Sequence, residues 1–376
     1  MFPSNIRSVA SRRIIVGVGI AGFCSYCLFV ACAYRTTPDS TTWPASSSAA
    51  STEADEFPLN AILTALREQW AFRDSVDWAE VEPEVRARVA RANSDSDRAK
   101  VIVDVFARVD DVHSILTVRG ESHAHYIGID EATRRRLLPL LDRERAQAGK
   151  VVVKILDDRV GYVLVPTMPA NTPEEVERLA RQLHDRISEA ARQQLTGWIV
   201  DLRLNGGGNL YPMLTGLRPL LGDGVVGGTI DPGGQRVQEW VLKPDGLYWR
   251  DTMGDRRFVE LDMSAEVPDP LIPVVVLVGP LTRSSGQGAA LAFQGRRRCL
   301  LLGEPTAKGY TTVTTPFALT SDVSLSLAVG FMADRSGIPC KSQVVPDLRL
   351  EGGDAFESLM EDEKVRAAIE RLQMAE

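Results

Sequence analysis

The strongest constraint on the fold is a continuous apolar run that ends at two adjacent serines. The run, Pro273–Gly279, is rich in valine and carries no charge, which is typical of a strand buried on both faces of a sheet. Thr282–Gln287 follows it, and the small apolar residues of Gly288–Phe293 favour a helix. The sequence therefore predicts a strand, a turn and a helix, with a serine hydroxyl at the helix N-terminus.

This serine pair has two compatible interpretations. The free backbone N–H groups and the dipole at a helix N-terminus stabilise a developing negative charge, so Ser284 is well placed to be a nucleophile. Ser284 and Gln287 also fit a capping box, in which the two side chains only satisfy unpaired amides of the first helical turn.

A second apolar segment runs into three consecutive glycines. Trp198–Leu202 is expected to be a strand, and Gly206–Gly208 follow it closely. Such glycines can adopt positive φ and bring their N–H groups close to a ligand. The segment therefore indicates either an oxyanion hole or an ordinary glycine-rich turn.

A third segment, residues 111–114, places His113 after a helical stretch. A histidine with a near-neutral pKa can take the proton of a serine hydroxyl and return it to a leaving amine. In isolation, however, a histidine here is also typical of a surface or capping residue.

Together, these segments resemble the C-terminal-processing (tail-specific) serine peptidases. The likeness lies in Asp-Val-His-Ser at 111–114, Asp-Leu-Arg-x-Asn-x-Gly-Gly at 201–208, and Thr-x-Ser-Ser-Gly-Gln at 282–287, followed by Gly-Glu-Pro-Thr-Ala at 303–307. It covers the chain from about Leu59 to Leu350. The chain has no room for the PDZ module of many members, so it is most similar to the branch of the nisin-resistance protease.

The resemblance implies an α/β fold with a ClpP/crotonase-like core, and it implies roles for five residues. Ser284 matches the nucleophile, and Ser285, Gly207 and Gly208 match the oxyanion-hole segments. The implied reaction is hydrolysis of peptide bonds through an acyl-enzyme, with a peptide or protein as substrate. Gln287 is the fifth residue, and it stands where the family commonly has a glutamate that orients the base; its amide is expected to orient the base by hydrogen bonding, but it cannot neutralise the charge of the protonated base. This departure keeps open an alternative, a catalytically weak or inactive peptide-binding relative.

Two residues compete for the role of base. Lys308 lies near the position of the lysine in the serine–lysine branch, but that branch usually has a glutamine where this chain has Thr312. A lysine base also needs burial in order to lose its charge near neutral pH. His113 matches the serine–histidine branch. We favour His113 as the base, keep Lys308 as the alternative, and consider Glu304 as an acid that could replace the missing glutamate.

The N-terminus predicts export. Three arginines precede an uncharged run at residues 14–34, which is long enough to span a bilayer. The positive-inside rule then places the rest of the chain outside the cytoplasm, either anchored or secreted after cleavage. The location is therefore expected to be the periplasm or the cell envelope, with membrane contact through residues 14–34 if they are retained.

Composition limits the other partners. The net charge of −7 argues against a nucleic-acid partner. We predict no metal site and no cofactor, because the only candidate spacing, Glu121-x-His123-x-His125, is more typical of a surface strand or loop. Cys299 and Cys340 are the two cysteines outside the N-terminal apolar run, and they could form a disulfide. The oligomeric state does not follow from the sequence.

Periodicity divides the chain into five parts. Residues 1–35 are the signal or anchor segment, 36–56 a flexible tether, 57–118 a small helical bundle, 119–149 a linking or capping segment and 150–376 the peptidase core. In the bundle, Pro83 is expected in the first turn of a second helix. In the core, strands alternate with helices, and Gly222–Arg257 suggests an insertion rich in hairpins.

Overall fold

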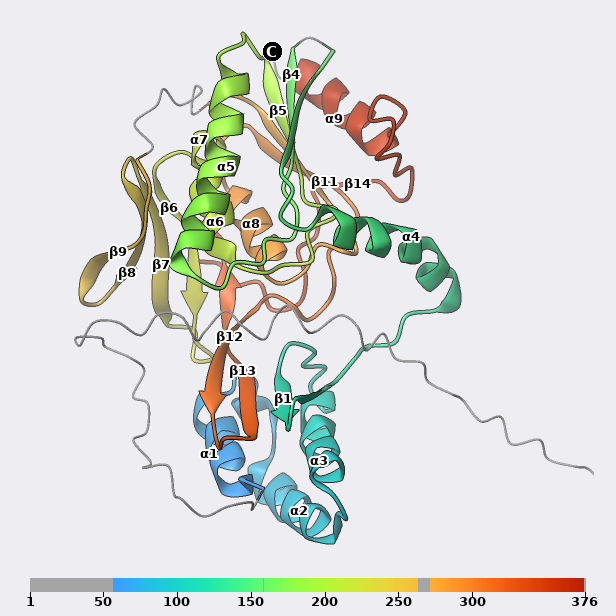
Figure 1. Ribbon diagram of the computed structural model, residues 1–376, viewed down its shortest axis with the longest axis vertical. Helices are drawn as coiled ribbons and strands as arrows, with labels where there is room; N and C mark the ends of the chain where they lie inside the picture. Colours follow the sequence, from blue (N-terminus) through green and yellow to red (C-terminus); the bar gives the residue numbers. More distant parts are fainter. Residues whose placement is uncertain (1–56, 158, 263–270, 375–376) are drawn as a thin grey trace, which may run out of the picture.

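The computed structural model describes residues 57–157, 159–262 and 271–374. It has a large α/β part and a smaller helical part, which strands β12 and β13 join (Figure 1). The predicted anchor at 14–34 and the tether at 36–56 lie outside the described residues. No helix within the described ranges has the length and apolar character needed to cross a membrane.

The first sheet is mostly parallel. Its strand order is β14-β11-β10-β5-β4-β3, and only β3 runs antiparallel to its neighbour. The strands are β3 (Val152–Leu156), β4 (Val160–Leu164), β5 (Gly197–Asp201), β10 (Val274–Val278), β11 (Cys299–Gly303) and β14 (Leu348–Arg349). The predicted apolar run thus forms β10 in the middle of this sheet.

Both faces of this sheet are covered, which explains why β10 has no polar alternation. Val274, Val276 and Val278 pack in one cluster with helices α5 (Pro173–Ala191), α6 (Leu210–Gly216), α7 (Arg218–Leu221) and α8 (Ser285–Phe293). Val275 and Leu277 point into another cluster, with α4 (Glu131–Gln147) and α9 (Glu363–Gln373). Alternate residues of a strand face opposite sides, so a strand between two helical layers must be apolar throughout.

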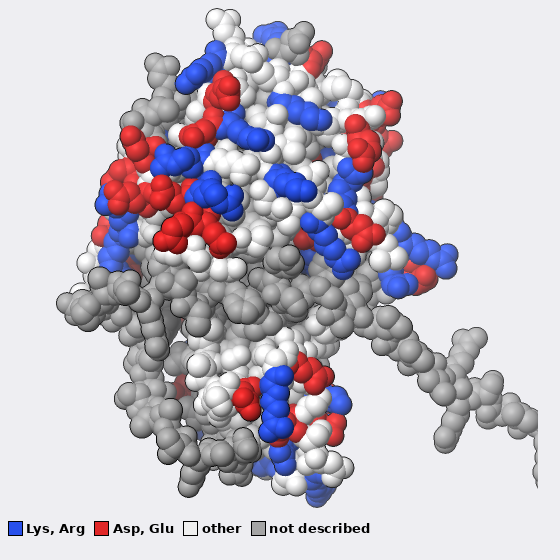
Figure 2. All heavy atoms as spheres, in the orientation of Figure 1, with Lys and Arg blue, Asp and Glu red and all other residues white. Residues whose placement is uncertain are grey.

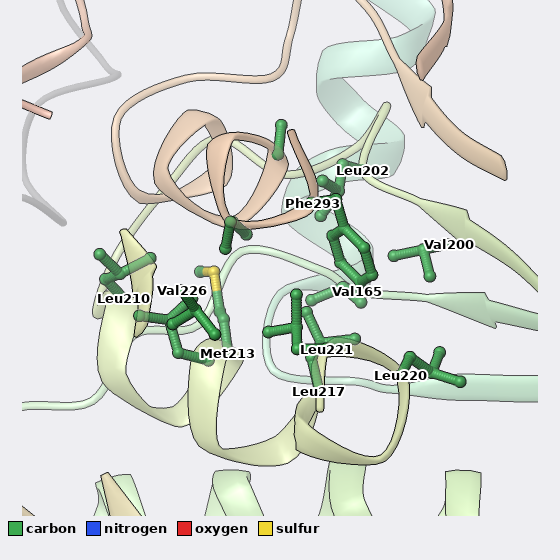
Figure 3. Packing of buried hydrophobic residues seen from close by; sticks show 14 of the residues in the cluster. Val165, Val200, Leu202, Leu210, Met213, Leu217, Leu220, Leu221, Val226 and Phe293 are labelled. Carbon is green, nitrogen blue, oxygen red and sulfur yellow. The ribbon is translucent and has the colours of Figure 1, made fainter. Parts of the chain in front are cut away.

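The helix after the serine pair is anchored by its apolar side chains. Figure 3 shows Phe293, at the end of α8, in one cluster with Met213 and Leu217 of the α6 region and with Val200 of β5. Each fully buried side chain of this size contributes about 1.5–3 kcal/mol to stability. This packing fixes the start of α8, and therefore Ser284, relative to the sheet.

The second sheet is antiparallel. Its order in the described residues is β2-β1-β13-β6-β7-β8-β9, and β12 pairs with β13 as well. The strands are β1 (Ile115–Val118), β2 (Glu121–Ala124), β6 (Gly224–Ile230), β7 (Arg236–Lys243), β8 (Gly246–Asp251), β9 (Gly254–Glu260), β12 (Thr312–Ala318) and β13 (Val323–Ala333). Strands β6 to β9 are consecutive antiparallel neighbours, as predicted for the hairpin-rich segment.

The N-terminal part contains the predicted helices and also strands. Helices α1 (Leu59–Gln69), α2 (Trp78–Arg91) and α3 (Asp95–Ala107) are followed by β1, and a short 3₁₀ turn at Arg73–Ser75 separates α1 from α2. The prediction that Pro83 opens a helix is wrong, because α2 begins at Trp78, with Asp77 as its N-cap, and Pro83 lies inside it. Leu325 and Leu327 of β13 complete the apolar cluster of these helices.

The arginine of the Asp-Leu-Arg segment has a structural role. Arg203 is buried, and its guanidinium donates to Asp201, at the end of β5, and to Asp354 and Asp362. Asp362 is also the N-cap of α9. The Arg203 cation therefore ties the end of β5, which leads into the glycines, to the C-terminal helix.

Candidate active site

Ser284 occupies a strained turn between β10 and α8. Its φ of 48° lies in the left-handed region that residues other than glycine rarely adopt. Its side chain makes no capping hydrogen bond to α8, so the capping interpretation does not describe it. The hydroxyl instead lies 3.1 Å from Nε2 of His113, a residue 171 positions away in the sequence.

Hydrogen bonds to backbone N–H groups fix the turn that carries His113. Oδ1 of Asp111 accepts hydrogen bonds from the N–H groups of His113 (3.0 Å) and Ser114 (3.1 Å). Oδ2 of the same carboxylate accepts one from Nε1 of Trp70 (2.7 Å), which comes from the end of α1. The Ser114 hydroxyl accepts from the N–H of Ala328 in β13. The Asp-Val-His-Ser segment is therefore a buried turn fixed to both α1 and β13.

The second ring nitrogen of His113 meets a hydroxyl group. Nδ1 lies 2.8 Å from Oγ1 of Thr312, which is buried at the start of β12. The ring of Tyr310 packs edge-on against the imidazole, with 5.4 Å between the ring centroids. Sequence reasoning did not identify Thr312 as a partner of the base. The only available signal was a hydroxyl-bearing residue a few positions after Lys308, and it says nothing about proximity to His113.

Burial determines the charge of His113. Desolvation lowers its pKa from the ordinary 6.5 to about 4, while the nearby Asp111 carboxylate opposes the shift. The imidazole is consequently neutral at pH 7. A neutral imidazole can accept a proton, as a general base must.

The two other ionisable candidates, Lys308 and Glu304, pair with charged side chains other than His113. About half of the Lys308 side chain is exposed, and its Nζ pairs with Asp110 at 3.1 Å, so Lys308 does not lie in the buried environment that a lysine base needs. Glu304 is engaged with Arg136 and Lys364.

Gln287 is fully buried, yet its amide does not orient His113 as expected. Its Nε2 donates to Oγ1 of Thr306 and to the carbonyl of Ala307. Its Oε1 has no hydrogen-bond partner among the described residues. In this structure Gln287 holds the loop after β11 through these two hydrogen bonds, and the Thr312 hydroxyl lies beside Nδ1 of His113.

The glycine loop lies against the serine. Gly207 and Gly208 have φ values of 111° and 101°, and a Cβ on Gly207 would come within 2.9 Å of the Ser284 Cβ. The N–H of Gly207 already donates to Oδ1 of Asn205 (3.0 Å). The Ser285 hydroxyl donates to the carbonyl of Gly208 (2.7 Å).

Two backbone amides beside the serine are unused. The N–H groups of Gly208 and Ser285 have no acceptor in the part of the chain that the structure describes. Of the three residues expected to line an oxyanion hole, Gly208 and Ser285 therefore have a free donor, whereas the donor of Gly207 is committed to Asn205.

The remaining sequence candidates do not form a second site. His123 and His125 face different carboxylates, Glu121 and Asp110, each at 3.7 Å. Within the described ranges, no group of three or more His, Cys, Asp or Glu side chains is arranged to hold a metal ion. Cys299 and Cys340, considered as a possible disulfide, are both free thiols.

Fold and sequence comparisons define the class of protein. Residues 159–350, just over half of the chain, match peptidase family S41, and the chain belongs to this family. It is thus a member of a family of peptidases, as its motifs predicted.

Three proteins are similar to this chain over a longer part of its length than the family match covers. The chain is 23% identical over 292 residues to the nisin-resistance protein of Lactococcus lactis subsp. lactis, covering 77% of this chain and 82% of that protein. Its fold is similar to that of a lipoprotein from Streptococcus agalactiae (TM-score 0.59, 17% identity, 85% of this chain and 96% of the other). It is also similar to a candidate peptidase from Parabacteroides merdae (TM-score 0.54, 16% identity, 85% and 97%). The predicted α/β core with preceding helices is confirmed.

Proposed function

We propose that this protein is an exported or membrane-anchored serine endopeptidase, with Ser284 as nucleophile and His113 as general base. The observation that carries the proposal is the 3.1 Å contact between His113 Nε2 and Ser284 Oγ. Such a distance is within reach for direct proton transfer between a nucleophile and its base. The neutrality of the buried imidazole and the strained turn at Ser284 support the same assignment.

The hydrogen bonds at His113 suit this role. In the proposed tautomer Nδ1–H donates a hydrogen bond to Thr312 Oγ1, which leaves the Nε2 lone pair to accept the Ser284 proton. The serine oxygen then attacks the peptide carbonyl carbon, and His113 becomes an imidazolium. The buried Asp111 carboxylate stabilises that cation through space, because its charge favours the protonated form of His113. Asp111 would thus supply part of the electrostatic support that a triad acid gives by direct contact.

The free N–H groups of Gly208 and Ser285 would donate to the oxyanion of the tetrahedral intermediate. On its collapse, Nε2–H gives the proton to the amine leaving group, which departs and leaves the acyl group on Ser284. His113 then deprotonates a water molecule, which attacks the ester carbonyl. As the second tetrahedral intermediate collapses, His113 returns the proton to the Ser284 oxygen, and the product leaves as a carboxylic acid that ionises in solution. No cofactor enters these steps.

The N-terminus and the relatives support an extracytoplasmic place of action. An uncharged run at 14–34 behind three arginines favours export. A relative named as a nisin-resistance protein and a structural neighbour named as a lipoprotein support a cell-envelope location. We therefore propose an extracytoplasmic peptide or protein substrate.

Cleavage of an unfolded model protein by the purified full-length chain tests the proposal. Ser284→Ala should abolish cleavage, and His113→Ala should reduce kcat by about a hundred- to ten-thousandfold, the contribution of a general base. Lys308→Ala, a charge change on an exposed side chain, should change it less than twofold.

Other outcomes would redirect the assignment. Loss of activity in Lys308→Ala with full activity in His113→Ala would identify Lys308 as the base. If the wild type binds peptides but neither cleaves them nor reacts with a fluorophosphonate at Ser284, the alternative holds, a catalytically inactive peptide-binding relative.

A further inference from the structure

One buried carboxylate contacts both sides of the candidate oxyanion hole. Glu144, near the end of α4, is buried, and its Oε1 accepts a hydrogen bond from the Thr167 hydroxyl (2.8 Å). The same hydroxyl oxygen accepts the N–H of Gly206 (2.8 Å), the first of the three glycines. Oε2 of Glu144 accepts from Nη2 of Arg283 (3.1 Å), the residue immediately before Ser284.

The spacing of these contacts depends on the absence of a side chain at Gly206. A Cβ at this position would overlap Oε1 of Glu144, and it would come within 2.7 Å of Nη2 of Arg283. Gly206 therefore allows the carboxylate to lie directly against the loop. The side chain of Arg283 is largely buried, which strengthens its pairing with Glu144 relative to a surface ion pair.

The two free donors come from the two segments that Glu144 joins. Gly208 belongs to the glycine loop after β5, and Ser285 begins α8. Their N–H groups can hold one oxyanion only if the two segments keep a fixed separation, since a displacement of about 1 Å can cost roughly a hundredfold in rate. Glu144 holds one segment through Thr167 and the other through Arg283, while its own helix belongs to neither.

We propose that Glu144 is a positioning residue that sets the geometry of the oxyanion hole. The inference rests on the proposed function, because the oxyanion hole matters only if Ser284 is acylated. Glu144 does not touch the substrate in this scheme. It acts by fixing the distance between the N–H groups of Gly208 and Ser285, and its negative charge also neutralises Arg283 beside the nucleophile.

Three variants separate the two contacts of Glu144, which are called its arms: the hydrogen bond from Thr167 and the ion pair with Arg283. Thr167→Val removes the acceptor for the Gly206 N–H and leaves the Arg283 pairing intact. Glu144→Gln can keep the Thr167 contact, but it brings an amide N–H towards Arg283 and loses the charge. Glu144→Ala removes both arms. Asp142→Asn is the matched control, because this acid lies on the same helix, is 80% exposed and pairs with its neighbour Arg145.

We expect kcat to fall about tenfold in Thr167→Val and Glu144→Gln and about a hundredfold in Glu144→Ala, with KM within twofold of wild type. A peptide boronate, which forms a tetrahedral adduct on Ser284, should lose affinity by the same factors as kcat/KM. Binding of the uncleaved peptide, measured in a Ser284→Ala background, should not change. Asp142→Asn should match wild type in every assay.

A purely structural role would not produce this split between boronate affinity and peptide affinity. The inference is overturned if Thr167→Val and Glu144→Gln keep wild-type kcat and boronate affinity, or if only KM changes. Should Glu144→Ala fail to fold, as judged by circular dichroism, the two milder variants decide. Fluorophosphonate labelling of the wild type separates the cases: without labelling at Ser284 the proposed function fails as well, whereas labelling with unaffected variants refutes only the role of Glu144.

Discussion

The burial of His113 predicts an unusual pH dependence for an enzyme with a histidine base. Because desolvation lowers the pKa of His113 to about 4, the imidazole should remain neutral far below the ordinary histidine pKa of 6.5. At pH 5.5, a base with a pKa of 4 is about 97% neutral, whereas a base with a pKa of 6.5 is about 10% neutral. Activity at pH 5.5 should thus stay close to its value at pH 7.5 instead of falling about tenfold.

The assay is kcat/KM against pH from 3.5 to 8, because this quantity reports the essential groups of the free enzyme. The substrate should contain no titratable side chain in this range. Samples held at each low pH and returned to pH 7.5 control for irreversible unfolding. Lys308→Ala should keep the same acid limb, since its side chain is about half exposed and pairs with Asp110. An acid limb with a midpoint near 6.5 in the wild type would refute the reasoning.

The same pKa makes a prediction about stability. The folded state binds a proton at His113 less readily than the unfolded chain, so this contribution to stability is complete above pH 6.5 and is lost progressively as the pH falls towards 4. The loss amounts to about 3 kcal/mol, from a shift of roughly 2.5 pKa units. Urea unfolding of Ser284→Ala with and without His113→Gln should isolate this term, because glutamine does not titrate.

Two further predictions concern Thr312, which contacts His113, and Arg203, which pairs with carboxylates at the end of β5. Thr312→Val removes the hydroxyl that lies 2.8 Å from Nδ1, so kcat should fall about 10- to 100-fold while peptide affinity in a Ser284→Ala background stays the same; an unchanged kcat would show that this hydroxyl does not support His113. Arg203→Met leaves the buried carboxylates of Asp201 and Asp362 and the half-buried carboxylate of Asp354 without their shared cation, and urea unfolding should show a loss of about 3–5 kcal/mol; a loss below about 1 kcal/mol would contradict the structural role given to Arg203.

The main elements of the core could be predicted because the residues that define them are consecutive in the sequence. The apolar run at 274–278 is typical of a strand covered on both faces, and the glycines after β5 favour a turn with positive φ, which Gly207 and Gly208 adopt. The position of Ser284 between strand and helix followed directly from this pattern. The start of helix α5 is equally local, because Thr172 and Glu175 form a capping box there and Pro173 is its first residue.

Contacts between distant segments could not be predicted in this way. Nothing in the periodicity of Thr312 says that its hydroxyl meets an imidazole 199 residues earlier in the chain. The choice between Gly207 and Gly208 as donor depends on the side chain of Asn205, which takes the N–H of Gly207. Likewise, the exposure of Lys308 depends on how its loop lies against Asp110, a distant residue in the sequence. The residues around Lys308 alone do not distinguish this exposed lysine from a buried one.

Strand β13 explains how two parts of the chain make one site. Residues 323–326 of β13 pair with β1, which directly follows His113, and residues 331–333 pair with β6 of the core, along the same edge. The opposite edge pairs with β12, where Thr312 lies opposite Phe331. One strand therefore sets the register of both His113 and its Thr312 partner.

This arrangement has a cost in folding and a benefit in precision. A slip of one residue between β1 and β13 would turn Leu116 out of the apolar cluster that α1 and α3 share with β13, so the alternative register is strongly disfavoured. The pairing joins segments about 200 residues apart, and such long-range pairing is slow because loop-closure entropy is lost before the contacts form. The contact between His113 and Ser284 therefore depends on the long-range pairing of β1 with β13.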